Sequence, residues 1–298
     1  MMTRIMITGV KGFFGRNLVD AWKDRYELTG VDYTGHVSST REPYDRWHNN
    51  VLLQDLTLPV SIPGLAKQHT VIHLAAKTRI TPSWNNIKSY YDTNITATQQ
   101  LFRQCQEQGV KRFVYFSSSS VYGNRWTRVP ESTELRPTNP YAVSKAAAEM
   151  ALSVQAQMGD TELIIVRPFT MYGNYMNFGE GALAIAKFIT ARERDEPLLI
   201  EGHGQKERDF VHASDAIKAL DLILAHGRSG DVFNIGTGQT VSIKAIADAV
   251  SHKQVIVPDR PGPIERTWAD ISKIRAFGFA PSVDLLEWLA VYLKTHNL

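Results

Sequence analysis

The chain has 298 residues, of which 43% are hydrophobic and 21% are charged, a balance typical of a folded globular protein. The 33 basic and 30 acidic residues give a net charge of +3 and form no run of one sign, so no nucleic acid and no membrane surface is expected as a partner. A single cysteine, Cys105, excludes an internal disulfide and is expected to pack in the interior.

The first apolar run opens directly onto three glycines, Gly9, Gly12 and Gly15, at the start of an amphipathic segment. Gly9 allows a tight turn, Gly12 lets the backbone approach phosphates, and Gly15 lets the new helix pack closely on the strand. The N–H groups at the start of that helix, around Phe13 and Phe14, would meet the negative charge of a pyrophosphate. The pattern therefore predicts a dinucleotide site.

A second apolar run, residues 26–31, ends in Asp32, about 20 residues after the glycines. A carboxylate at this position can accept hydrogen bonds from the ribose hydroxyls of adenosine. It would also repel a 2′-phosphate, and no Arg or Lys follows until Arg41. The expected cofactor is therefore NAD and not NADP.

From residue 4 to about 167, short β-rich runs alternate with longer helical stretches. Strands are predicted at 71–74, 112–117 and 163–166, with helices at 90–108 and 141–158. This alternation indicates parallel strands joined by crossover helices, and the strands are apolar on both faces. The predicted fold is therefore α/β, with a Rossmann-type doubly wound parallel sheet.

The texture changes after residue 167, where elements become shorter and Gly and Pro cluster at 201–204 and 258–263. We expect residues 1–167 to form an NAD-binding Rossmann domain. Residues 168–298 would form a smaller C-terminal α/β substrate-binding domain, partly interleaved with the first.

Tyr141 and Lys145 lie four residues apart at the start of a predicted helix, so they share a face of it. A phenol is a poor base at neutral pH, but a nearby ammonium and an oxidised nicotinamide would both favour the phenolate. Tyr141 could then take a proton from a substrate hydroxyl.

A run of serines, 117–120, follows the strand at 112–117 and offers hydroxyl groups at the carboxyl edge of the sheet. Ligands bind at this edge in doubly wound folds. Thr78 follows the preceding strand, so the loop that it begins is expected to line a sugar pocket.

These residues together resemble the extended short-chain dehydrogenase/reductase superfamily, in particular its nucleotide-sugar epimerase/dehydratase group, which includes UDP-galactose 4-epimerases. The matching motifs run almost from end to end, at 8–15, 55–56, 73–76, 94, 118–123, 141–145, 167–173, 208–215, 233–238 and 260–262.

The resemblance implies that Ser118 is the catalytic hydroxyl, that Tyr141 is the base and that Lys145 is its partner. It also implies that Arg208 grips the diphosphate of a substrate and that Arg260 is a second clamp, in keeping with the fit of a guanidinium to phosphate oxygens. Thr170 departs from the family pattern, which usually has an asparagine there, so the usual amide contact to phosphate is not expected.

The residues and the resemblance together assign the site. The expected cofactor contacts are Gly9, Gly12, Phe13, Phe14, Gly15, Asp32, Asp55, Leu56, Leu74, Ala75, Ala76, Asn94, Ser117, Tyr141 and Lys145. The expected substrate contacts are Thr78, Ser118, Ser119, Tyr141, Thr170, Arg208 and Arg260. No metal is expected, because His73, His203 and His212 lack the spacing of metal ligands.

Ser119 and Ser120 stand where the similar 4,6-dehydratases carry an Asp-Glu pair for eliminating water. Without those carboxylates the residues favour oxidation at one carbon, and we predict an NAD-dependent nucleotide-sugar 4-epimerase that passes through a 4-keto sugar. The alternatives are a 4-keto-sugar reductase or dehydratase of the same family, and a dinucleotide-binding sensor or scaffold without catalysis.

The expected partner is a nucleotide-diphosphate sugar. By resemblance, the two long helices at 90–108 and 141–158 would pack against a second copy in a homodimer. The N-terminus shows no signal-peptide pattern and no apolar segment approaches the length that spans a bilayer, so a cytoplasmic location is expected.

Overall fold

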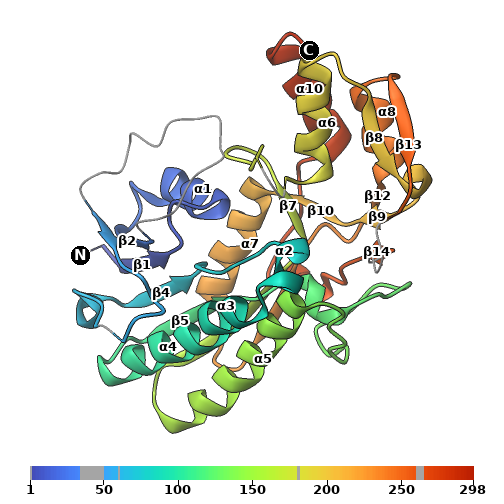
Figure 1. The fold of residues 1–298 in the computed structure, drawn as a ribbon. Coiled ribbons are helices and arrows are strands. Elements are labelled where there is room, and N and C mark those ends of the chain that lie inside the picture. Colours follow the sequence, from blue (N-terminus) through green and yellow to red (C-terminus); the bar gives the residue numbers. More distant parts are fainter. Residues whose placement is uncertain (1, 34–49, 60, 180–181, 260–264) are drawn as a thin grey trace.

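Within the described residues, 2–33, 50–59, 61–179, 182–259 and 265–298, the computed structural model contains a sheet of seven parallel strands in the order β11-β6-β5-β4-β1-β2-β3 (Figure 1). This confirms the doubly wound α/β fold. The strands are β1 (Arg4–Thr8), β2 (Glu27–Asp32), β3 (Val51–Leu53), β4 (Thr70–His73), β5 (Arg112–Phe116), β6 (Glu162–Pro168) and β11 (Val232–Ile235).

Helices cover both faces of the sheet, because the central strands are apolar on both sides. One apolar core joins the sheet to the helices on its first face, which are α1 (Phe13–Trp22), α7 (Ala213–His226) and α9 (Ser272–Arg275). A second core joins the opposite face to α4 (Thr98–Glu107) and α5 (Pro140–Gln155). No helix among the described residues has the length and apolar character needed to cross a membrane.

The direction of winding reverses between β1 and β4. From β1 the chain builds outward through β2 and β3, whereas β4, β5 and β6 extend the sheet on the other side. The loops that leave the carboxyl ends of β1 and β4 therefore face each other across this switch point, where doubly wound folds bind their ligands.

The helix predicted at 90–108 is interrupted. It is observed as α3 (Ile87–Tyr91), a π-helical segment η2 (Asp92–Ala97) and then α4. Such π segments often occur at functional sites, and this one contains Asn94. The other predicted long helix corresponds to α5, which ends in the 3₁₀ turn η4 (Ala156–Met158).

The C-terminal half builds a second lobe around a third apolar core, at the upper right of Figure 1. It contains α6 (Ala184–Glu193), α8 (Ile243–Val250), α10 (Leu285–Thr295), and the paired strands β8 (Leu198–Glu201) and β13 (Gln254–Val257). Between the lobes lie the pair β7 (Thr170–Tyr172) and β10 (Phe210–His212), and the sheet of β9 (Glu207–Arg208), β12 (Val241–Ser242) and β14 (Arg266–Thr267).

The chain returns to the first lobe after entering the second. Strand β11 pairs with β6 at the edge of the large sheet, and α7 packs beside α1. The remaining short helices are η1 (Leu65–Lys67), α2 (Ile80–Asn85), η3 (Ser119–Tyr122) and η5 (Gly202–Gly204). The division into domains at residues 167 and 168 stays a prediction. The first lobe also uses residues after this point, because β11 joins its sheet and α7 and α9 pack on it.

Candidate active site

The glycine turn after β1 is packed against the loop after β4. Gly9 has φ +72° and donates its N–H to the Val31 carbonyl at 2.8 Å. A Cβ at Gly9 would lie 2.7 Å from the Ala75 nitrogen, and a Cβ at Gly15 would lie 2.6 Å from the Gly9 oxygen. The backbone of this turn therefore lies so close to the loop after β4 and to helix α1 that neither Gly9 nor Gly15 has room for a side chain.

Helix α1 begins directly after this turn. Gly12 is its N-cap and supplies no side chain to cap the helix. Phe14 packs its ring on Phe116, with 5.3 Å between the ring centroids, so only its main chain can face a ligand. The N–H groups at this helix start are thus suited to an anion such as pyrophosphate.

Asp32 lies at the end of β2 and is 5% exposed. Its two carboxylate oxygens accept N–H groups from Lys11 at 2.6 Å and from Tyr33 at 2.8 Å. A carboxylate has further acceptor capacity after two such bonds, so these contacts hold Asp32 beside the glycine turn without excluding a ribose hydroxyl. Asp55 lies beyond β3 and accepts from Thr57, and Leu56 packs against the second core.

Leu74, Ala75 and Ala76 form the loop after β4 and are half-buried. Thr8 fixes its start, because the Leu74 N–H donates to the Thr8 carbonyl at 3.1 Å. His73 is buried between the hydroxyls of Thr8, at 2.7 Å, and Thr98, at 2.9 Å. Burial lowers the pKa of His73 to about 3, so it is neutral and ties β4 to the first strand and to helix α4.

Asn94 joins this loop to helix α5. Its Oδ1 accepts the Lys77 N–H at 2.8 Å, and its Nδ2 donates to the Lys77 carbonyl and the Ser144 hydroxyl, both at 2.9 Å. The side chain is 1% exposed and its donors are used by the protein. A cofactor contact of Asn94 stays a prediction, and the observed bonds instead hold α5 in place.

Ser118 and Tyr141 meet at the carboxyl end of β5. The Ser118 hydroxyl lies close enough to the Tyr141 phenol to lower its pKa. The Ser118 Oγ accepts from the N–H and hydroxyl of Ser120 at 3.2 and 2.9 Å. Tyr141 lies in the first turn of α5, which begins at Pro140 and is capped by Asn139. Its N–H donates to the Ser83 hydroxyl at 3.2 Å, which fixes the helix start against α2.

Burial moves both titratable groups of the predicted pair towards their neutral forms. It raises the pKa of Tyr141, which the hydrogen bond from Ser118 lowers and the nearby Tyr90 raises. It lowers the pKa of Lys145 to about 7, against the attraction of Glu149. The lowering of the Tyr141 pKa by Lys145 stays a prediction.

Lys145 lies one turn after Tyr141 on the same face of α5. Its Nζ is 4.5 Å from the centroid of the Tyr115 ring, within the range of a cation–π contact. Tyr115 is fully buried on β5, and its hydroxyl has no hydrogen-bond partner among the described residues.

The residues at the switch point fit a dinucleotide. The Ser117 Oγ is buried directly above β5, and within the described part of the chain it has no hydrogen-bond partner. A bound dinucleotide would give this hydroxyl a partner and would place its negative charge at the uncapped helix start of Gly12. It would also explain why the turn after β1 has glycines, which leave no side chain between the backbone and the phosphates.

The predicted substrate residues fall into two groups. Both Thr78 and Ser119 lie in the first lobe, Thr78 in the loop after β4 and Ser119 at the start of η3 after β5. Thr170 and Arg208 lie between the lobes, where the Thr170 N–H donates to the carbonyl of Asp209 at 3.0 Å. Arg260 lies outside the described residues.

Arg208 is held in a partly buried position on β9. Its Nη1 donates to the main-chain carbonyls of Glu207 at 2.8 Å and Glu265 at 3.1 Å. Burial lowers its pKa, but a guanidinium keeps its charge at neutral pH. Within the described ranges, no group of three His, Cys, Asp or Glu side chains could hold a metal ion.

Three supporting residues were not predicted. Ser83 anchors the Tyr141 N–H, Tyr90 lies near the Tyr141 hydroxyl, and Asp209 holds the loop at 237–238. Asp209 is fully buried and accepts from three main-chain N–H groups and one hydroxyl. Its position beside Arg208 was a usable signal, whereas no local pattern marks Ser83 or Tyr90.

Comparison with known proteins agrees with this geometry. A profile of the NAD-dependent epimerase/dehydratase family matches residues 5–236. An uncharacterised UDP-glucose epimerase, YtcB of Bacillus subtilis, is 31% identical over 96% of this chain and 95% of its own. The dTDP-D-glucose 4,6-dehydratase of Mus musculus is 29% identical over 94% of this chain and 84% of its own. The solved structure of MoeE5 with UDP-glucose and NAD is 31% identical, with a TM-score of 0.84 over 99% of this chain and 98% of that one.

Proposed function

Because the chain belongs to the NAD-dependent epimerase/dehydratase family, we propose that it is a nucleotide-sugar 4-epimerase that uses NAD. The observation that carries the proposal is the approach of the Ser118 and Tyr141 side chains, one helical turn from Lys145, at the carboxyl edge of the sheet. Two hydroxyls and an amine so arranged suit oxidation and reduction at one alcohol carbon.

When bound, NAD would supply the acceptor for the hydride from C4 of the sugar and the source of the same hydride for the 4-keto sugar, so no cofactor would be consumed in a cycle. The chain would hold its pyrophosphate at the glycine turn and the start of α1, and its adenosine ribose at Asp32. Lys145 and the hydroxyl of Ser117, which has no partner among the described residues, would lie near the nicotinamide end of NAD. The remaining contacts to NAD would come from Asp55, Leu56 and the loop at 74–76.

Tyr141 takes the proton of the sugar C4 hydroxyl in this mechanism, and Ser118 donates a hydrogen bond to the same oxygen. The proximity of the two side chains supports a shared target, because a single substrate oxygen could then contact both hydroxyls. The resulting 4-keto sugar turns about its diphosphate and presents its other face, after which Tyr141 returns the proton.

The residues after Ser118 favour epimerisation over dehydration. Elimination of water needs an additional acid and base, whereas Ser119 and Ser120 carry hydroxyls and no carboxylate. The Ser120 hydroxyl is engaged with Ser118 at 2.9 Å, which fits a role in orienting that residue.

A nucleoside diphosphate is the proposed handle of the substrate. Arg208 would bind it with its guanidinium, with Thr170 nearby and Arg260 as a second clamp. Thr78 and Ser119 would line the sugar. The UDP-glucose bound by MoeE5 supports this class of ligand.

The test is incubation of the purified protein with UDP-, dTDP-, GDP- and CDP-sugars, with the stereochemistry at C4 followed by NMR. Inversion at C4 without net change in reduced nicotinamide absorbance is expected, and Tyr141→Phe should lose nearly all turnover while it still binds NAD. Stoichiometric consumption of reduced nicotinamide would identify a reductase, and loss of water would identify a dehydratase. Full activity of Tyr141→Phe would refute the proposed base.

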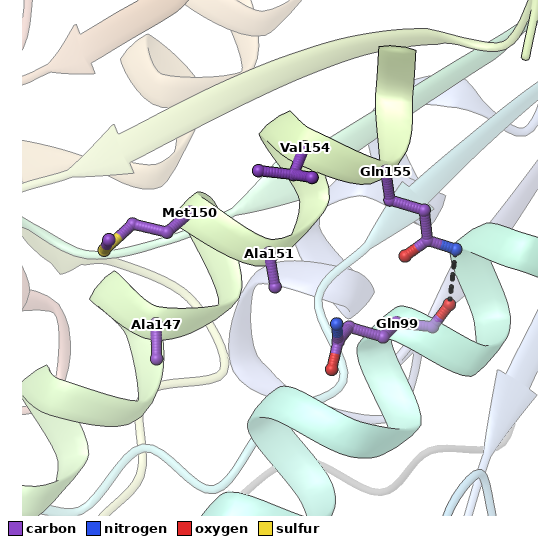
Figure 2. Close-up of a pocket in the computed structure, with 6 residues that line it drawn as sticks. All are labelled: Gln99, Ala147, Met150, Ala151, Val154 and Gln155. Atoms are coloured by element: carbon purple, nitrogen blue, oxygen red, sulfur yellow. Dashed lines mark hydrogen bonds between the residues drawn. The ribbon is translucent and has the colours of Figure 1, made fainter. Parts of the chain in front are cut away.

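We further propose a homodimer through the outer faces of α4 and α5. Met150, Val154 and Met158 on this face are 67%, 66% and 84% exposed. Figure 2 shows the hollow between the two helices, which is lined by Gln99, Ala147, Met150, Ala151, Val154 and Gln155. Small and apolar side chains along one helix face suit close packing against a second copy.

Light scattering after gel filtration tests the dimer. Met150→Glu should give a monomer, because it places a charge in the centre of the proposed interface. Val291→Glu on α10 is the control, since Val291 is 64% exposed and lies in the other lobe. A monomeric wild-type protein, or a dimer that survives Met150→Glu, would contradict the proposal.

A further inference from the structure

A buried ion pair involves the helix that carries Tyr141 and Lys145. Arg167 at the end of β6 binds Glu149 of α5 through its Nη2 at 2.6 Å and its Nε at 3.1 and 3.2 Å. The side chains are 6% and 4% exposed. A buried pair of charges loses hydration on folding, so it is weak evidence for a contribution to stability alone.

The same guanidinium reaches a third segment. Its Nη1 donates to the Tyr122 hydroxyl and the Glu131 carbonyl, both at 2.9 Å. The Tyr122 hydroxyl donates in turn to Asn234 at the end of β11, at 2.7 Å. Arg167 therefore connects α5, the short helix η3 and two strand ends through buried polar bonds.

The segments that this network joins are those that carry the reacting groups. Tyr122 ends η3, four residues after Ser118, and Glu149 lies one turn beyond Lys145 and two beyond Tyr141 on α5. The distance between the Ser118 hydroxyl and the Tyr141 hydroxyl thus depends on two helices that Arg167 holds together.

The groups that face Lys145 are almost all neutral at pH 7. The titratable and charged residues around the lysine and its phenol partner are His73 of β4, Tyr90 of α3, Tyr115 of β5, Tyr141 and Glu149 of α5, and Arg167 of β6, which is bound to Glu149. Burial keeps the histidine and the phenols uncharged. Glu149 is the carboxylate among these groups.

We infer that Glu149 is a positioning residue of this centre. Held by Arg167, it fixes the helix of Tyr141 and Lys145 against the Ser118 segment and places a negative charge one helical turn from the lysine. The catalytic meaning of this inference rests on the proposed function, whereas the arrangement and its effect on the lysine do not.

The experiment follows Lys145 directly by NMR in protein labelled with ¹³C at the lysine ε-carbon. In the wild type, one lysine is expected to titrate near pH 7, and its loss in Lys145→Met assigns it. In Glu149→Gln the midpoint should fall by about one pH unit or more, because an opposite charge beside the amine is removed.

Glu162→Gln is the matched control. Glu162 binds Arg112 at 2.6 Å and joins β5 to β6 at the opposite ends of the strands. Its loss removes an ion pair between elements of the same sheet, and the titration of Lys145 should not move. A purely structural role for Glu149 predicts the same result for both variants, namely lower stability and an unchanged midpoint.

A double variant, Glu149→Gln with Arg167→Gln, removes both charges and leaves neither buried alone, which addresses a failure of the single variant to fold. Its lysine midpoint should also lie below that of the wild type. An unchanged midpoint in a folded Glu149→Gln or in the double variant overturns the inference.

Turnover is the second readout, with whichever nucleotide sugar the wild type converts. At a pH above both midpoints, Glu149→Gln should turn over about tenfold more slowly if its lysine midpoint lies one pH unit lower, because the protonated fraction of the lysine is then tenfold smaller. Its pH profile should move with the NMR midpoint, and that of Glu162→Gln should not. If the wild type converts no nucleotide sugar, the proposed function fails while the titration still decides the role of Glu149.

Discussion

Substitution of Gly9 by alanine tests the close approach between the turn after β1 and the loop after β4. Gly109 provides a matched control, because its φ of +71° is nearly the same as the +72° of Gly9. A Cβ at Gly109 meets nothing within 4 Å, whereas a Cβ at Gly9 lies 2.7 Å from the Ala75 nitrogen and 2.9 Å from its Cα. The pair of variants therefore separates backbone strain from steric conflict.

The left-handed backbone costs a residue with a Cβ roughly 1–2 kcal/mol, and this cost applies to both variants. Gly9→Ala adds a clash with main-chain atoms, for which overpacking costs about 1–3 kcal/mol. We expect Gly109→Ala to lose about 1–2 kcal/mol of unfolding free energy and Gly9→Ala about 2–5 kcal/mol. Relief of the clash would also widen the switch point and misplace the helix start at Gly12.

Urea unfolding with and without NAD measures the stability of both variants, and calorimetric titration measures their affinity for NAD. Gly9→Ala should be the less stable protein and should bind NAD at least about tenfold more weakly, which corresponds to about 1.4 kcal/mol. Gly109→Ala should bind NAD as the wild type does. Equal stability and equal affinity of the two variants would refute the argument that this turn is set by its contact with Ala75.

Three further outcomes are expected. Burial lowers the folded-state pKa of Lys145 to about 7, while the unfolded value is near 10.5. Between these two pH values the wild type should therefore gain stability relative to Lys145→Met as pH rises, by at most about 1.4 kcal/mol per pH unit. Urea unfolding measures the difference, and a pH-independent difference would contradict the prediction. Asp209→Ala should lose about 3 kcal/mol or more in the same assay, because three main-chain N–H groups lose their acceptor, while the exposed Asp248→Ala should change little. Cys105 is fully buried with a raised thiol pKa, so a thiol reagent should modify it only as fast as the protein opens, and rapid modification of the folded protein would count against the packing.

The sheet could be predicted because its signals are local. Each central strand is a short apolar run, and the glycine spacing after β1 is typical of the turn that binds a dinucleotide. The doubly wound fold was confirmed on this basis. The interruption of the helix at 90–108 was not predicted. The π segment contains Asn94, whose bonds run to Lys77 and Ser144 outside the helix, and no local pattern indicates such partners.

The polar network beneath the site was also beyond sequence reasoning. Arg167 was visible only as part of a motif, and nothing local indicates that it would bind Glu149, Tyr122 and a carbonyl near residue 131 at once. Such bonds depend on which side chains the packed sheet and helices bring together. Only the spacing of Glu149 from Lys145, one helical turn, could have been noticed in advance.

Burial changes how the tyrosine and lysine of this site work together. The sequence alone suggested that an ammonium and an oxidised nicotinamide both make the phenol more acidic, but the low dielectric of the interior penalises both the ammonium and the phenolate. It raises the pKa of Tyr141 and lowers that of Lys145, so the two groups resist charge at the same time. Glu149 opposes this effect at the lysine, and the hydrogen bond from Ser118 opposes it at the tyrosine. Burial therefore favours the neutral phenol of Tyr141, and the positive charge of a bound nicotinamide would favour its ionised form.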